Sequence, residues 1–277
     1  MNIKDYMGIN IADRLKGISK ECYLAAWNWM EGAWGQNVEF ERLSSQILLC
    51  EETRNYLYTD ENPVSHYVKG ERPILEKIAN EVCKDCKSDR EKVLAILVYV
   101  RDLHKTNDGR DFFYGGTEEE LIKKGEWFCE RVARIMAGLC EIMNMPSRIV
   151  FHIASGHLAN EVFFEGKWAY FDPRFANFYM KDDVFLSTDE IVKNREIVFE
   201  QSDFVNGFRS DFRSLDYARH RAYNFYFSPK ETQCIGDYSL MDAKKYHFDW
   251  VPVFSEGKPN ERTIHSRYAE TGLMQLI

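Results

Sequence analysis

The sequence predicts an α+β fold in which one helix packs on an antiparallel sheet. Two patterns carry this prediction. Residues 129–143 place apolar and small side chains at the spacing of one helix face. After Pro146 the period becomes two, which is typical of strands and predicts three of them, at residues 148–153, 157–164 and 168–172. A helix followed directly by a strand meander indicates an α+β core.

Residues 1–70 show helical spacing as well, so we expect an N-terminal helical subdomain. Its apolar side chains form two runs, the first of Ile11, Leu15, Ile18, Cys22, Ala25 and Trp29 and the second of Leu43, Ile47 and Cys50. Asn62 and Pro63 end the second run. Because no linker rich in Pro, Gly or Ser follows, we expect this subdomain to pack on the core instead of forming an independent domain.

Two helix-start signals precede the central helix. A helix is expected from Pro73 to about residue 87, since apolar residues recur there at helical spacing. Ser88 and Glu91 have the spacing of a capping box that starts the next helix, and Thr117 and Glu120 repeat that spacing. These helices lead the chain to the central helix.

The chain divides into three expected parts. Residues 1–70 form the helical subdomain, residues 71–205 the core, and residues 206–277 a C-terminal extension that packs on the core. In the extension, aromatic and histidine side chains recur at helical spacing, which is typical of a core face: Tyr217, His220, Tyr223 and Tyr226. No internal repeat is present, so one domain with helical additions is the simplest partition.

Composition limits the classes of function. With 277 residues, 45% of them hydrophobic, the chain can bury one sizeable core. The 44 acidic residues exceed the 36 basic ones and no Lys/Arg block stands out, which argues against a nucleic-acid partner. No run approaches the ~18 apolar residues that a membrane helix requires, and charges interrupt the N-terminus. We therefore expect no signal peptide, no membrane association and a cytoplasmic location.

Cys129 falls in the first turn of the central helix. The free N–H groups and the positive dipole end of a helix stabilise an anion there, and they lower the pKa of a thiol from about 8.5 toward values at which the reactive thiolate forms. The chain has seven cysteines, an odd number that fits reduced thiols better than a disulfide framework. Cys129 is therefore the candidate nucleophile.

His157 and Asp172 lie on neighbouring predicted strands. Two registers are possible for the hairpin, with either residues 165–166 or residues 166–167 as its loop. The first makes Asp172 the diagonal neighbour of His157, and in both registers the two side chains share a face. Backbones of a diagonal pair are roughly 7 to 8 Å apart, a gap that these side chains can close with a hydrogen bond.

A thiolate, a histidine base and an orienting carboxylate form the cysteine version of a catalytic triad. We therefore predict Cys129 as nucleophile, His157 as general base and Asp172 as the group that holds the imidazole in the useful tautomer. The thiolate would attack an amide or ester carbonyl, and the backbone N–H of Cys129 would supply part of the oxyanion hole. This chemistry requires no cofactor and no metal.

These residues carry a resemblance to a known family. The segment resembles the core of the transglutaminase-like cysteine enzymes over about residues 71–175. The residues that match the family pattern are Gly125 and Cys129, Pro146 and Arg148, His157 with Glu161 and Val162, and Trp168 with Asp172 and Pro173. The resemblance implies a papain-like core and the same three catalytic residues. It makes hydrolysis of a peptide or amide the first choice and amine transfer the alternative.

Two other classes of function are left open by the residues. Trp127 and Ala159 stand where many family members have a glycine and an aromatic residue, so a non-catalytic binding module with the same fold stays open as an alternative. A metal site would instead use His152, His157 and Cys140.

The one Cys-x-x-Cys pair, Cys83 and Cys86, has two interpretations. It has the spacing of half a zinc site or of a redox pair. No second pair of ligands follows, however, and Cys83 continues the apolar stripe of a helix. Core packing is therefore the favoured interpretation.

Overall fold

The computed structural model describes residues 46–59, 62–106, 117–125, 128–152, 155, 157–209, 214–231, 233–237, 254–255 and 258–259. Most of the expected N-terminal helical subdomain lies outside these residues, so its helices stay a prediction. Where the structure does describe it, the run through Ile47 differs from the expectation, because Gln46–Leu48 forms strand β1 and helix α4 begins only at Glu51–Tyr58. A short apolar run fits a strand as well as a helix, and here pairing with a distant strand decides.

Five antiparallel strands form the central sheet, in the order β1-β7-β2-β3-β4. Besides β1, the strands are β2 (Ser147–His152), β3 (His157–Phe164), β4 (Lys167–Phe171) and β7 (Gln233–Asp237). The three strands predicted after Pro146 are confirmed, with ends shifted by at most one residue. The α+β class is confirmed as well.

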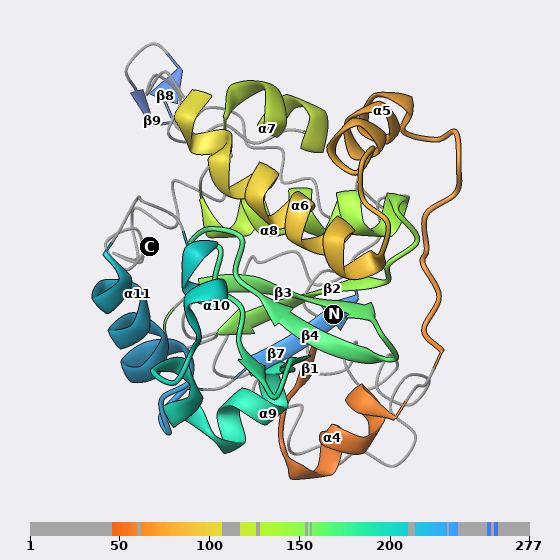
Figure 1. Ribbon diagram of the computed structural model, residues 1–277. Coiled ribbons are helices and arrows are strands. Elements are labelled where there is room, and N and C mark those ends of the chain that lie inside the picture. The colour runs from red at the N-terminus through yellow and green to blue at the C-terminus, as the bar shows by residue number, and fades with distance from the viewer. Residues whose placement is uncertain are drawn as a thin grey trace, which may run out of the picture.

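The central helix α8 (Cys129–Ile142) and the three helices that precede it in the chain lie on one side of the sheet (Figure 1). The preceding three are α5 (Pro73–Val82), α6 (Asp89–Asp102) with the 3₁₀ turn η1 (Leu103–Thr106), and α7 (Glu118–Lys124). Both halves of the Thr117 capping box form, and Gly125 ends α7 with a left-handed φ of 75°. Ser88 caps α6 by accepting from the Glu91 N–H, but the Glu91 carboxylate accepts from the Lys87 N–H instead of closing a capping box.

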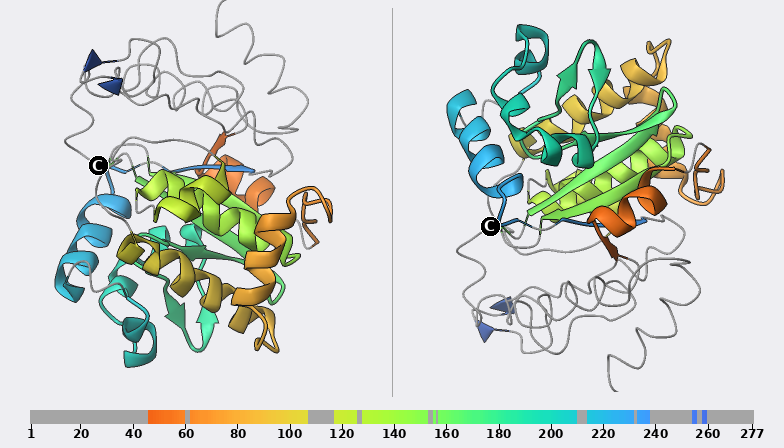
Figure 2. Two further views of the ribbon diagram at one scale, coloured as in Figure 1. Left: turned by 90° about the horizontal axis from the view of Figure 1, so that it is seen from above. Right: turned by 90° about the horizontal axis from the view of Figure 1, so that it is seen from below.

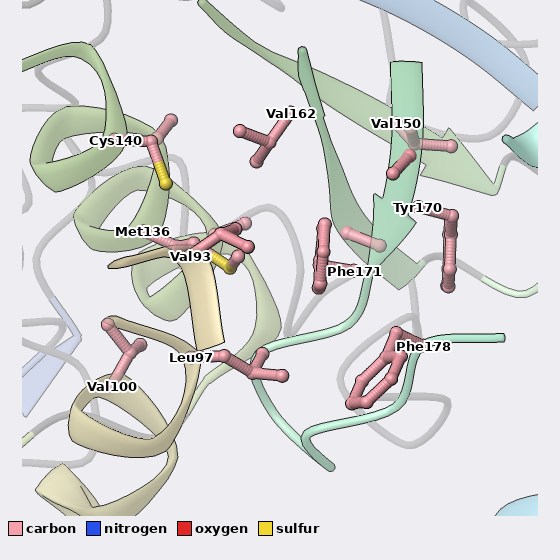
Figure 3. Packing of buried hydrophobic residues seen from close by; sticks show 14 of the residues in the cluster. Val93, Leu97, Val100, Met136, Cys140, Val150, Val162, Tyr170, Phe171 and Phe178 are labelled. Atoms are coloured by element: carbon pink, nitrogen blue, oxygen red, sulfur yellow. The ribbon is translucent and has the colours of Figure 1, made fainter. Parts of the chain in front are cut away.

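The main core lies between α6, α8 and the sheet (Figure 3). Val93 and Leu97 of α6 and Met136 of α8 are fully buried there. On the sheet side of the core, alternate strand residues point at these helices. Phe171 points into this layer, whereas Tyr170, the residue before it, lies on the opposite face of β4 (Figure 3). That opposite face carries the polar groups described below.

The segment after β4 surrounds the far end of the sheet. It contains β5 (Met180–Lys181), β6 (Val184–Phe185), α9 (Thr188–Lys193), η2 (Arg195–Val198), α10 (Asp203–Gly207), α11 (Leu215–Arg221) and the π-helix η3 (Ala222–Tyr226), with β8 (Phe254–Ser255) and β9 (Lys258–Pro259) following β7. Figure 1 and Figure 2 place α11 at the end of the sheet away from α4 and α5.

The C-terminal extension does more than pack on the core. Its strand β7 lies between β1 and β2, so the sheet joins chain from all three expected parts. The expected boundary between residues 205 and 206 falls inside α10. In the part of the chain that the structure describes, no helix has the length and apolar character needed to cross a membrane.

Candidate active site

Cys129 is the first residue of α8, as predicted, and Phe128 is the N-cap with extended backbone (φ −68°, ψ 139°). The first N–H groups of a helix have no acceptor within the helix, so they are available to an anion at this end. Cys129 is 2% exposed. The thiol therefore meets the helix dipole in a water-poor surrounding, where electrostatic effects are larger than in water.

The hairpin of β3 and β4 adopts the first of the two predicted registers. Phe164 pairs with Lys167, so Glu165 and Gly166 form the two-residue loop, and both have positive φ (53° and 78°). The ladder stops after the pair of Asn160 and Phe171. The chain then turns away.

This turn aims Asp172 at His157. The backbone of Asp172 bridges to Asn177, which turns the chain directly after β4. His157 Nε2 donates to Asp172 Oδ2 at 2.8 Å, and the N–H of Arg174 donates to Asp172 Oδ1 at 3.1 Å. The predicted contact between the histidine and the carboxylate is confirmed, and the other ring nitrogen of His157, Nδ1, is left for Cys129.

Electrostatics favour a charged pair at Cys129 and His157. Burial lowers the pKa of His157, but the charge and hydrogen bond of Asp172, followed by those of Cys129, outweigh burial and raise the pKa to about 9. Burial raises the pKa of Cys129, but the hydrogen bond and charge of His157, the charge of Arg174 and the N–H of Leu158 outweigh it, so that this pKa lies below the ordinary value. A lowered pKa of the Cys129 thiol beside a raised pKa of the His157 imidazole favours the thiolate–imidazolium pair over the neutral pair.

Other residues of the family pattern build a separate buried cluster. Arg148 donates through Nε (2.8 Å) and Nη2 (2.6 Å) to one oxygen of Glu161. The guanidinium lies 3.9 Å from the ring centroid of Trp168 and 4.9 Å from that of Tyr58. This arrangement fixes α4 and β4 against β3, so we assign these pattern residues to structure and not to chemistry.

The expected alternative of a metal site is not supported by the described side chains. His152 pairs directly with His157 across β2 and β3, so the two share a face. Both nitrogens of His152 are used, however: Nδ1 donates to the carbonyl of Tyr226 at 2.9 Å and Nε2 accepts from the hydroxyl of Tyr170 at 3.2 Å. Cys140 lies 11 residues along α8 from Cys129, about 16 Å at 1.5 Å per residue. Among the residues that the structure describes, no group of three or more His, Cys, Asp or Glu side chains is placed to hold a metal ion.

The remaining candidates differ from Cys129 in their surroundings. Burial raises the pKa of Cys140 well above its ordinary value and that of Cys83 to about 12. Cys83 is the C-cap of helix α5, Cys86 follows the turn after it, and the two share a side-chain hydrogen bond. Ala159 is fully buried inside β3, and Trp127 lies outside the described residues.

Sequence reasoning missed Tyr226 as part of this site. Its ring stacks on the His157 imidazole with 4.1 Å between centroids and 8° between planes. The helical spacing of the aromatic residues in 215–227 indicated only a core face. A local sequence pattern does not predict a contact between residues as far apart in the chain as His157 and Tyr226.

Comparison with known proteins identified one family for part of the chain. Residues 76–173 match the model of the transglutaminase-like superfamily, a segment that contains Cys129, His157 and Asp172. The recognition made from the sequence is confirmed for this part of the chain. Searches of curated proteins and of solved structures gave no match.

Proposed function

From the transglutaminase-like segment at residues 76–173, we propose that the chain is a cysteine-dependent acyl-transfer enzyme that hydrolyses a peptide or amide bond. The observation that carries the proposal is the order of contacts: Cys129 at a helix N-terminus, His157 beside it, and Asp172 bonded to the far nitrogen of His157. Each group has the partner that its role in a triad requires.

The first half of the reaction forms an acyl-enzyme. The Cys129 thiolate attacks the carbonyl carbon, and a carbon–sulfur bond forms as the carbonyl electrons move onto oxygen. The N-terminal N–H groups of α8, beginning with that of Cys129, stabilise this oxyanion. The imidazolium of His157 then gives its Nδ1 proton to the leaving amine as the carbon–nitrogen bond breaks, which leaves a thioester and a neutral imidazole.

The second half releases the acyl group. The neutral imidazole of His157 takes a proton from water, the resulting hydroxide attacks the thioester, and the carbon–sulfur bond breaks to give an acid and regenerate the charged pair. Asp172 keeps Nε2 of His157 protonated in both halves, so that only Nδ1 exchanges protons with reactants. If an amine replaces water, the same steps give a new amide.

The test uses an activated ester, p-nitrophenyl acetate, because its acyl transfer needs no particular peptide sequence. A cysteine enzyme should release nitrophenolate in a burst and carry one acetyl group on Cys129, identified by peptide mapping. Cys129→Ala should lose the burst, whereas the matched variant Cys140→Ala should keep it because that thiol is buried in the last turn of α8, at the opposite end from Cys129. Acetylation at other residues only, or a burst that survives Cys129→Ala, would reject the nucleophile.

The product distribution separates hydrolysis from transfer. With a small primary amine present, a transferase forms acetyl amide in proportion to the amine concentration, whereas a hydrolase keeps forming acetate. We expect acetate to dominate. The alternative of a binding module predicts neither product and no acetylated Cys129.

A further inference from the structure

Tyr226 covers one face of the candidate general base. The two rings are nearly parallel, with 8° between planes and 4.1 Å between centroids. Tyr226 and His157 are 1% and 2% exposed, so the contact is dry. Two further rings lie near His157, that of His152 at 5.9 Å between centroids and 27° between planes and that of Phe175 at 6.2 Å and 36°, and both are too far for the same overlap.

The polar ends of Tyr226 are both held by hydrogen bonds. Its carbonyl accepts from His152 Nδ1 at 2.9 Å and from Gln233 Nε2 at 2.8 Å. Its hydroxyl accepts from Arg221 Nε at 2.8 Å. The donors come from β2, β7 and α11, so three elements fix the ring over His157.

The π-helix explains how the Tyr226 carbonyl becomes available. In η3 the Phe227 N–H donates to the Ala222 carbonyl, five residues back, at 2.8 Å. This wide turn ends the helix at Tyr226, whose carbonyl accepts from side chains of the sheet instead of a following helical N–H. Single π-turns are frequent at functional sites because they reorient one side chain within a helix.

Stacking has two consequences for His157. A parallel ring at van der Waals distance blocks rotation of the imidazole about its side-chain bond, which keeps Nε2 on Asp172 and Nδ1 toward Cys129. The aromatic face also stabilises a positive charge, so the imidazolium form gains over the neutral one. Both effects favour the charged pair.

We propose that Tyr226, through this stacking, is the positioning residue of His157 in the Cys129–His157 pair. The proposal rests on the proposed function, since it assigns Tyr226 to the same site. His152 and Gln233 act one step further out, because they hold the Tyr226 backbone. His152 thus has a structural role, holding the Tyr226 carbonyl, that requires no metal.

The first experiment compares two substitutions of Tyr226 in the full chain. Tyr226→Leu removes the ring, whereas Tyr226→Phe keeps the ring and removes only the hydroxyl. The readout is the ultraviolet absorbance of the thiolate against pH, taken as the difference between each protein and its Cys129→Ala counterpart. This signal does not depend on access of a reagent to the buried sulfur.

Tyr226→Leu should shift the thiolate titration to higher pH and slow acetylation of Cys129 by roughly 10-fold or more, because the imidazole is no longer held in position. Tyr226→Phe should rescue most of both properties. Phe175→Leu is the matched control, an equal loss of ring near His157 without stacking, and it should titrate like the wild type. An unshifted titration in Tyr226→Leu overturns the proposal, and so does an equal shift in Tyr226→Phe or in Phe175→Leu.

A second measurement needs no destabilising variant. In the wild type, the ring protons of His157 should have nuclear magnetic resonance signals displaced upfield by the Tyr226 ring, with the signal assigned by its loss in His157→Gln. Signals at ordinary positions would reject the stacking. Failure of the proposed function has a different outcome, because Cys129 would then titrate as an ordinary thiol in the wild type and ignore His157→Gln.

Discussion

Two buried charged clusters lie on the same face of β3, and they differ in whether a proton can move. At one end His157 contacts Asp172 and Cys129, and four residues along the strand Glu161 contacts Arg148. The separation is roughly 13 Å at the rise of a strand. Both clusters match the family pattern, yet of the two only the His157 cluster includes a thiol and an imidazole.

The Arg148–Glu161 cluster is closed. Glu161 accepts from Arg148 with one oxygen and from Tyr58 and the Thr188 N–H with the other, while Arg148 also donates to the Leu57 carbonyl. A guanidinium does not release its proton in a protein. The His157 cluster instead joins two groups that can titrate, a thiol whose pKa is lowered and an imidazole whose pKa is raised to about 9. Buried charge therefore marks structure or chemistry according to which groups can titrate.

The largest expected effect is that of Cys129→Ala. Acyl transfer should fall by at least ~10³-fold, because the variant removes the thiol that hydrogen-bonds to His157. The free energy of unfolding should change by only about 1 to 2 kcal/mol, since a small side chain replaces a small one. Burst kinetics and denaturant unfolding measure the two quantities, with Cys140→Ala as control. A variant that keeps its burst would break the comparison at its functional end.

Arg148→Met should have the opposite profile. Glu161 would be left buried without its cation, so we expect a loss of about 3 to 5 kcal/mol in the free energy of unfolding. Acylation per folded molecule should stay within about threefold of the wild type, because the cluster lies on a different part of β3. The control is Arg90→Met, which removes the exposed pairs with Glu165 and Asp183 and should cost no more than about 1 kcal/mol. A stable Arg148→Met protein with little acylation would contradict the structural assignment.

Asp172→Asn tests how the carboxylate maintains the charged pair. Burial alone lowers the pKa of His157, and Asp172 contributes first among the groups that raise it to about 9. Without the carboxylate charge the proton returns from the imidazolium to the sulfur, so the pKa of His157 falls and that of Cys129 rises. Acylation at neutral pH should drop by roughly 10- to 100-fold.

The pH dependence of Asp172→Asn follows with a definite sign. A folded pKa raised above the unfolded value of 6.5 gives stability that is complete below pH 6.5 and is lost as the pH rises through about 9. The difference in free energy of unfolding between wild type and variant should therefore be largest near pH 6 and shrink toward pH 9.5 or so. Denaturant unfolding across this range measures it. A difference that grows with pH would show that His157 is neutral in the folded protein.

Short sequence patterns correctly predicted those parts of the site whose position depends on a single helix or hairpin. The change of period at Pro146 placed the strands, and the loop at Glu165 and Gly166 allowed the register that brings Asp172 to His157. The helix pattern placed Cys129 at a helix start. These features depend on interactions between residues close in sequence, which a periodic pattern records.

Long-range pairing was beyond such patterns. Ile47 pairs with Ile235, 188 positions later in the chain, and neither short strand carries an alternation long enough to distinguish it from a helix. The stacking of Tyr226 on His157 depends on a π-turn and on donors from the sheet, which no spacing in the sequence encodes. The face that His152 shares with His157 likewise depends on the strand pairing itself.

The smallest expected effect concerns alkylation of the thiols. Cys129 has a pKa below the ordinary value, whereas burial raises the pKa of Cys140 well above it and that of Cys83 to about 12. An ordinary thiol is only a few per cent ionised near neutral pH, so at pH 6 to 7 Cys129 should react with iodoacetamide at least ~10-fold faster than the other described cysteines. The advantage is limited to small reagents, because Cys129 is 2% exposed and any reaction requires the surrounding chain to open.

Peptide mapping after brief labelling of wild type and His157→Ala gives the labelling rates, and a bulky maleimide used in parallel separates access to the thiol from its ionisation. Slower iodoacetamide labelling in His157→Ala, with unchanged maleimide selectivity, assigns the advantage to the charged pair. Equal labelling of Cys129 and Cys140 would remove the distinction between the helix N-terminus and the helix interior on which the nucleophile depends.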